Sequence, residues 1–418
     1  MMKTRWSSVV ALLAAFTLVM AACGDDGADT TAPTQPPETT AAPTTEAPEP
    51  FKFGMILVGP HNDRGWSQAH YEAGQYLERT LGAEMIWLDK VNTADRPDTT
   101  VDQVVDDMVA QGAKLVFATS DDMRDGAEIG AANNPGTPVI WSSGDSAWTE
   151  GKAYNPAPNL GNTMGRMYYA KFMAGCAAAL MTETGNIGYL GPLINDETRQ
   201  LVNATYLGAR YCYDEYRGLD ADDLTFSVNW IGFWFHIPGF TLDPTQVATD
   251  FFDGGADVVV SGIDTTEALV IAGQRTRAGQ TAWAVPYDYE GACAEAPEVC
   301  LGVPYFNWGP AYKRIAESVI AGTYQASWEW FGPNWDDVDD HATSGIGFIK
   351  GDGLTAEAAA DLDDFIAGLA SGAIKLYVGP LNYQDGSVYL EAGEEADDFT
   401  IWYTEQLLEG IIGASAPS

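Results

Sequence analysis

Carboxylate, amide and aromatic side chains follow many of the short apolar segments of this sequence. Indole and phenol rings can stack on a flat ligand, whereas carboxylate and amide groups can bind ring nitrogens, amino groups or hydroxyls. This combination suits a neutral, flat and polar ligand such as a nucleobase or a nucleoside. The candidate ligand-binding residues are Asn62, Trp66, Asp121, Asp145, Glu197, Trp234, Asp264, Asp288, Asn307 and Trp308.

Positive charge is scarce around these residues. Arg64 and Arg124 are the cationic side chains near them, so a phosphorylated ligand would lack the partners that phosphate needs. Structural roles stay open for individual members, because each tryptophan could belong to the core and Asp121, Asp264 and Asp288 could cap helices. Their convergence behind strands is more specific to ligand binding than any single residue.

Patterns typical of enzymes and metal sites are missing from the sequence. It has no GxSxG, no HExxH, no phosphate loop and no GxGxxG behind a strand. His61 is the one candidate general base, and it has no Ser or Cys partner by pattern, which favours a binding or surface role. The four histidines are scattered and no CxxC spacing occurs. We therefore expect a binding protein without catalytic residues, metal or cofactor.

Apolar β-rich segments alternate with helical segments from residue 51 onward, which is typical of βα units and parallel sheets. A stretch rich in Ser, Gly, Asn and Pro at 142–163 separates two series of alternating strands and helices, which are similar in size and spacing. We therefore expect two α/β lobes. Ligands of such sheets bind outside the carboxyl ends of the strands. The predicted strands are 53–58, 85–88, 115–118, 139–141, 187–190, 224–231, 258–260, 283–286, 301–306, 347–349 and 376–378.

The elements after 283–286 are too few for a third lobe and are expected to complete the first two, so the chain should cross between lobes more than once. The expected organisation is a signal peptide at 1–22, a linker at 23–50, lobe 1 at 51–160 plus 285–325, lobe 2 at 161–284 plus 326–382, and a C-terminal segment at 383–418.

The N-terminus reads as a secretory signal. Lys3 and Arg5 precede an apolar stretch at 9–20, which is short for a membrane span, and small residues precede Cys23. The run ending in Cys23 resembles a bacterial lipoprotein box, which implies lipidation of that cysteine. The Pro-, Thr- and Ala-rich residues that follow predict a disordered tether.

Charge and cysteine content agree with an extracytoplasmic binding protein. The chain has 21 Lys and Arg against 59 Asp and Glu, a net charge of −38, which argues against nucleic-acid binding and a polybasic membrane surface. Besides Cys23, four cysteines permit three disulfide connectivities. We favour Cys293–Cys300, which closes a short Pro-containing loop, and Cys176–Cys212, which joins two helical segments.

Several ordered segments, together spanning about residues 51–325, are similar to those of one family. They are the lipoprotein box, the loop 59–66 with the following 68–74, and the segments 203–210, 229–234, 255–264 and 305–310. This set resembles the basic membrane protein (BMP) family, the substrate-binding lipoproteins of ABC transporters for purines and purine nucleosides.

The resemblance implies a type I periplasmic binding protein fold, with two doubly wound parallel-sheet lobes and a ligand cleft between them. It implies that Trp66 stacks on the ligand, that Asp264 binds it, and that Asn307 and Trp308 form the family's Asn-Trp pair. Two departures stand out. Relatives carry Pro before the residue at Glu197, where this chain has Asp196, and the segment 236–240 is longer than usual.

These implications define the expected function. The protein should capture a purine base or nucleoside by lobe closure and deliver it to an ABC permease, as a monomer held at the extracytoplasmic face of the cell membrane through lipidated Cys23. The alternatives are a receptor for another flat or polar ligand, riboflavin or a sugar, and a secreted nucleoside hydrolase.

Overall fold

A computed structural model describes residues 49–417 of the chain. The expected signal peptide at 1–22, the lipidation site Cys23 and most of the linker at 23–50 lie outside the described residues. Within residues 49–417, no helix combines the length and the apolar character that crossing a membrane requires.

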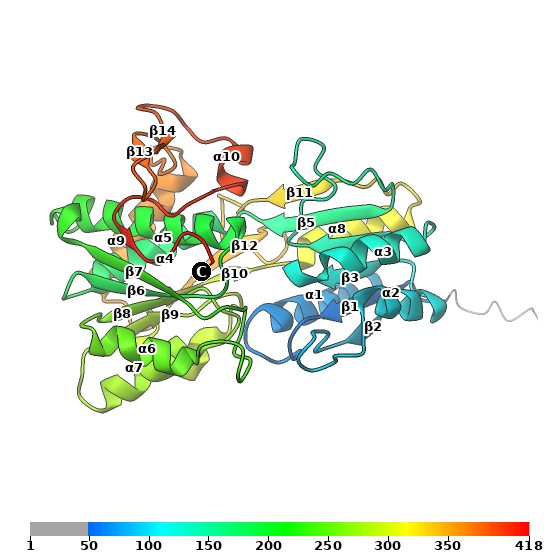
Figure 1. The fold of residues 1–418 in the computed structure, drawn as a ribbon, viewed down its shortest axis with the longest axis horizontal. Coiled ribbons are helices and arrows are strands. Elements are labelled where there is room, and N and C mark those ends of the chain that lie inside the picture. The colour runs from blue at the N-terminus through cyan, green and yellow to red at the C-terminus, as the bar shows by residue number, and fades with distance from the viewer. Residues whose placement is uncertain (1–48, 418) are drawn as a thin grey trace, which may run out of the picture. The chain divides into compact units, whose positions relative to one another are not determined.

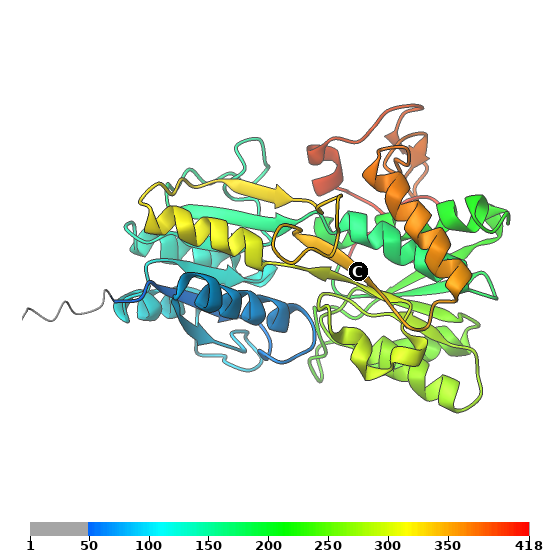
Figure 2. The same ribbon diagram turned by 180° about the vertical axis from the view of Figure 1, so that it is seen from behind.

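Lobe 1 is built on a parallel six-stranded sheet with the order β11-β5-β4-β3-β1-β2 (Figure 1). The inner strands are almost wholly buried, because helices cover both faces of the sheet. Figure 2 shows α8 and α1 together against one face. The elements are β1 (Lys52–Leu57), α1 (Trp66–Leu81), β2 (Glu84–Leu88), α2 (Val101–Ala110), β3 (Val116–Thr119), α3 (Arg124–Asn133), β4 (Val139–Ser142), β5 (Leu160–Gly165), α8 (Gly309–Ile320) and β11 (Trp328–Phe331).

Lobe 2 is built on a parallel five-stranded sheet with the order β15-β7-β6-β8-β9. The antiparallel pair of β10 and β12 extends it, because isolated bridges join β10 to the segment of β9. The elements are α4 (Tyr168–Met181), β6 (Asn186–Gly191), α5 (Asp196–Glu215), β7 (Thr225–Trp230), α6 (Pro244–Asp253), β8 (Val258–Ser261), α7 (Glu267–Arg277), β9 (Trp283–Val285), β10 (Gly302–Phe306), β12 (Ile346–Lys350), α9 (Ala356–Ala370) and β15 (Ile411–Ile412).

The chain passes between the lobes three times. It crosses from β5 to α4, from β10 to α8, and from β11 back to β12. The expectation of more than one crossing therefore agrees with the sheet topology. These crossings are the segments in which a hinge motion between lobes would have to occur.

The expected lobe boundaries are corrected in three places by strand pairing. β5 pairs with β4 in lobe 1, although residues from 161 onward were assigned to lobe 2. β10 pairs with β12, although 285–325 was assigned to lobe 1. β11 pairs with β5, although 326–382 was assigned to lobe 2. Which strand pairs with which depends on the arrangement of all strands in the sheet. The amino-acid composition of one strand therefore does not indicate its neighbour.

Some expected elements also differ. β5 is fully buried but lies mostly within the expected break at 142–163, because its Gly, Asn and Thr residues resemble a turn. The helix that follows, α4, begins at Tyr168. The strand expected at 376–378 is reduced to an isolated bridge between Val378 and Glu395. It is followed by a short ribbon of β13 (Leu381–Asn382) and β14 (Val388–Leu390), and by α10 (Asp398–Trp402).

The two disulfides in the structure are the pairs favoured from the sequence, Cys176–Cys212 and Cys293–Cys300. The first joins α4 to α5, which pack unusually closely. A Cβ on Gly208 would lie 2.1 Å from the carbonyl oxygen of Phe172, so only glycine permits this approach. The disulfide joins the C-terminal part of α5 to the buried helix α4, whereas the residues of α5 that contribute to the site lie in its first turns.

Candidate functional site

A cavity lies between the carboxyl ends of the parallel strands of both lobes. About 420 Å³ of empty space, including space open to solvent, lies between its lining side chains. Lobe 1 contributes the segments after β1, β3 and β4, and lobe 2 those after β6, β7, β8 and β9. The lining residues are Trp66, Ser120, Asp121, Ser143, Tyr189, Pro192, Glu197, Thr198, Leu201, Trp234, Gly262, Asp264, Tyr287 and Asp288.

The structure brings most of the predicted binding residues to this cavity, from strand ends far apart in sequence. The other four, Trp308 among them, do not line it. Asn62 is exposed, Asp145 accepts a hydrogen bond from Tyr403 at a neighbouring cavity, and Asn307 donates to a backbone oxygen at Ser344, 2.7 Å away. The predicted residues on the wall are Trp66, Asp121, Glu197, Trp234, Asp264 and Asp288.

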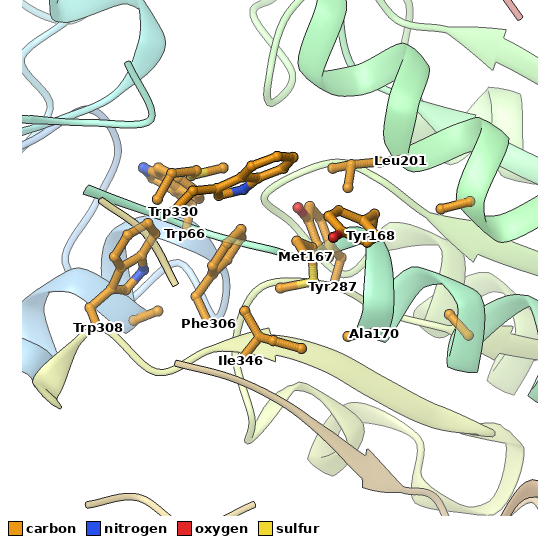
Figure 3. Close-up of a cluster of buried hydrophobic side chains, with 14 of the residues drawn as sticks. Trp66, Met167, Tyr168, Ala170, Leu201, Tyr287, Phe306, Trp308, Trp330 and Ile346 are labelled. Carbon is orange, nitrogen blue, oxygen red and sulfur yellow. The ribbon is translucent and has the colours of Figure 1, made fainter. Parts of the chain in front are cut away.

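Trp66 is the aromatic residue that lobe 1 contributes to the cavity wall, and other residues fix its position from the side away from the cavity. Its indole N–H donates to the backbone oxygen of Thr119 over 2.6 Å, and its ring meets His70, Phe306 and Trp308 edge-on, with centroids 4.6, 5.2 and 5.3 Å away. Trp308 therefore lies behind Trp66 and not on the wall, as Figure 3 shows. Its ring packs against that of Trp66, which the sequence predicts to stack on a ligand.

The start of α1 is fixed by Asp63, which sequence reasoning did not select. Its carboxylate accepts hydrogen bonds from the backbone N–H groups of Gly65, Ser67 and Gln68, at 2.9–3.0 Å. Gly65 also lies close to lobe 2, because a Cβ there would lie 1.7 Å from the carbonyl oxygen of Asp264. Trp66 of lobe 1 and Asp264 of lobe 2 are thereby brought to one cavity.

Glu197 reaches the cavity from the first turn of α5. Asn195 caps this helix by accepting a hydrogen bond from the N–H of Thr198 over 2.8 Å. Burial raises the pKa of Glu197 to about 8, with a further contribution from the charge of Asp121. The pKa of Asp121 is itself raised by burial. Carboxyl groups crowded in this way favour protonated forms, which can donate as well as accept hydrogen bonds.

Asp288 is buried on the cavity wall without a partner for its carboxylate. Among the described residues, neither Oδ1 nor Oδ2 accepts a hydrogen bond, and its backbone is left-handed with a φ of 71°. Both features cost free energy, and such features cluster at ligand sites. Burial raises the pKa of Asp288 well above its ordinary value, while the charge of Lys171 and, to a smaller extent, the neighbouring side chain of Tyr287 oppose that rise. Donors on a ligand would satisfy this group.

Two other polar groups on the wall lack partners within the part of the chain that the structure describes. They are the hydroxyl of Ser143 and the indole N–H of Trp234. Ser143 also has a left-handed backbone, with a φ of 89°. The cavity thus offers a ligand a carboxylate acceptor at Asp288, an N–H donor at Trp234 and a hydroxyl at Ser143.

Lys171 is a buried cation behind the wall that sequence reasoning missed. Its ammonium donates to the backbone oxygen of Ser261 over 2.7 Å and lies 3.4 Å from the ring centroid of Tyr287. Burial lowers its pKa to about 7, although the charges of Asp288 and Glu197 oppose the change. The only sequence signal was one lysine inside the otherwise apolar stretch that forms α4.

Comparison with known proteins agrees with this architecture. Residues 51–334 match the Bmp family, described as ABC transporter substrate-binding protein PnrA-like. A purine-binding protein of Brucella abortus is 28% identical over 357 residues, which cover 85% of this chain and 91% of that protein. A putative ABC transporter glucose-binding protein of Haloferax volcanii is 25% identical over 296 residues, 71% of this chain and 68% of that protein.

The fold also matches solved structures. An ABC transporter solute-binding protein from Aeropyrum pernix superposes with a TM-score of 0.61 at 13% sequence identity, over 78% of this chain and 93% of that one. The expected type I periplasmic binding protein fold is therefore confirmed, as is the resemblance found in the sequence. The chain belongs to the Bmp family of PnrA-like ABC transporter substrate-binding proteins.

Proposed function

We propose that this substrate-binding protein captures a purine base or nucleoside between its lobes and delivers it to an ABC permease. The observation that carries the proposal is the unpartnered Asp288 carboxylate of lobe 2, which shares one cavity with the Trp66 ring of lobe 1. A ligand that stacks on Trp66 and donates to Asp288 must contact both lobes. Such a ligand stabilises the closed arrangement through contacts that exist only when the lobes meet.

Purine chemistry fits the polar groups of the wall. A purine offers a flat face for Trp66, N–H or amino donors for Asp288, and ring nitrogens that accept from the Trp234 indole. A ribose would add hydroxyls for the remaining carboxyl groups. The purine-binding relative in Brucella abortus, matched over most of both chains, supports the same class.

A sugar is the second candidate. It is favoured by the relative named as a putative glucose-binding protein and by the number of carboxyl groups on the wall, since carboxylates bind hydroxyls well. Riboflavin presents a flat face as well. A hydrolase is disfavoured by the family, and the wall of the described cavity contains no histidine.

Calorimetry with adenosine, AMP, riboflavin and glucose tests the ligand class. We expect adenosine to bind most tightly, and AMP to bind at least about tenfold more weakly, because its phosphate would lose its hydration beside Asp121, Asp264 and Asp288 in a cavity whose described wall carries no Lys or Arg. Equal affinity for AMP would contradict the electrostatic argument. Binding of glucose or riboflavin without adenosine would contradict the purine class, and conversion of adenosine to adenine and ribose would indicate a hydrolase.

Trp66→Ala should weaken adenosine binding by about 1–3 kcal/mol, the amount that one base–aromatic stack contributes in nucleic-acid binders. Trp66→Phe should lose less, because a ring remains. Trp87→Ala is the matched control, since Trp87 lies on lobe 1 and is 38% exposed away from the cavity. The melting temperature of each variant is measured as well, so that a loss of ligand binding can be distinguished from a loss of folding. Parent-like affinity in folded Trp66→Ala would show that Trp66 is only structural.

We further propose that the body is a monomer anchored at the extracytoplasmic face of the cell membrane through lipid on Cys23. The support is the order of signal, lipoprotein box and polar tether in the sequence. Cell fractionation tests the anchor: Cys23→Ser should move the protein from the membrane to the soluble fraction. A mutant that stays in the membrane fraction would rule out lipidation at Cys23 as the anchor.

A further inference from the structure

Residues 397–417, here called the clasp segment, follow the family match at 51–334 and contact both lobes. On lobe 2 they are joined by backbone pairing, because β15 lies parallel to β7. Asn203 of α5 adds two hydrogen bonds, accepting from the N–H of Leu408 and donating to the carbonyl of Gln406, each over 3.0 Å. The clasp segment is therefore fixed to the lobe 2 sheet and to α5.

The same segment is bonded to polar groups of lobe 1 and of the first crossing. Arg166, between β5 and α4, makes two hydrogen bonds to the carboxylate of Asp398, each over 2.6 Å. The hydroxyl of Tyr403 donates to the buried carboxylate of Asp145 and accepts from the backbone N–H of Lys152 over 2.6 Å. Both acidic groups would lose their partners if the lobes moved apart.

Aromatic contacts strengthen this junction. The ring of Tyr403 lies parallel to that of Trp148 in lobe 1, with centroids 5.6 Å apart. Trp402 packs edge-on against Trp328 and Trp330 of β11, with centroids 5.2 and 5.0 Å apart. These rings are at most partly exposed, so separation would expose apolar surface to water. In Figure 1, α10 lies close to β11 and the β4–β5 connection.

The clasp segment also borders the approach to the ligand cavity. Trp402 and Tyr403 line a second, larger cavity, of about 1,220 Å³ of empty space, which shares Asp121, Ser143 and Glu197 with the ligand cavity. A widening of the gap between Tyr403 and lobe 1 would therefore enlarge the route that leads to the ligand. The clasp segment therefore lies beside the route to the ligand and is bonded to lobe 1, so its contacts could control ligand exchange.

We propose that residues 397–417 act as a clasp that holds the two lobes together and slows ligand exchange. The inference rests on the proposed lobe closure. Because the segment is paired with β7 and α5 of lobe 2, rotation of lobe 1 away from lobe 2 must break its bonds to Asp145 and its aromatic contacts with Trp148, Trp328 and Trp330. The bond between Arg166 and Asp398 resists the same motion at the first crossing.

The test compares the parent with the double variant Tyr403→Phe/Asp398→Asn, which removes one hydroxyl and one charge with little loss of volume. Spin labels are placed at cysteines introduced at Ala132 of lobe 1 and Gln274 of lobe 2, both exposed. Their distance distribution is measured by pulsed electron paramagnetic resonance with and without excess adenosine. The matched control is Tyr154→Phe/Glu391→Gln, the same chemical changes at two exposed residues outside the clasp contacts.

Without ligand, the parent and the control should show one short distance, and the clasp variant should add a longer one. Adenosine should restore the short distance, with release about tenfold faster than from the parent. A clasp variant with the parent's distances and release rate would overturn the clasp, whatever its melting temperature. A clasp variant that opens but ignores adenosine would support the clasp and contradict the purine proposal. Long distances already present in the ligand-free parent would also overturn the clasp.

Discussion

Several carboxyl groups are buried between the two lobes, and the free energy that this burial costs sets what the cavity can bind. Glu197, Asp264 and Asp288 sit on one cavity wall, where the loss of water raises the pKa of each. Lys171 is the buried cation that opposes this rise at Glu197 and Asp288. Removing a carboxyl group from water costs free energy unless hydrogen bonds to the protein replace those to water. The carboxylate of Asp288 accepts no hydrogen bond within residues 49–417. Ligand donors can supply these bonds when the lobes are closed.

The fold supports this cavity by bringing strand ends of two sheets together. Parallel strands place the segments after β6, β8 and β9 at one edge of lobe 2, and those after β1, β3 and β4 at one edge of lobe 1. The crossing after β10 brings Trp308 behind Trp66. A residue next to a crossing between the lobes therefore packs against the ring proposed to meet the ligand, so a crossing segment and the cavity wall are in direct contact.

Much of this architecture could be predicted from the sequence, because apolar strands followed by polar loops identify the carboxyl edge of a parallel sheet. Six residues of the cavity wall were selected in this way: Trp66, Asp121, Glu197, Trp234, Asp264 and Asp288. How deeply a side chain is buried could not be predicted. Trp308 follows a strand, as a stacking tryptophan would, but it lies behind Trp66 and not on the cavity wall. Lys171 looks in the sequence like any lysine of a helix, although it is buried. The pairing of strands could not be predicted either, since the residues of β5 resemble those of a turn. The hydrogen bond from Tyr403 to Asp145 joins residues more than 200 positions apart, so neither local sequence indicates it.

A crystal structure of the protein with bound adenosine would show whether one ligand joins Trp66 to Asp288. We expect the base to stack on the ring of Trp66, and a ligand N or O donor atom to lie about 2.7–3.2 Å from a carboxylate oxygen of Asp288. Adenosine bound outside the cavity between the lobes, or inside it with the Asp288 carboxylate still without a donor, would contradict the proposed binding mode.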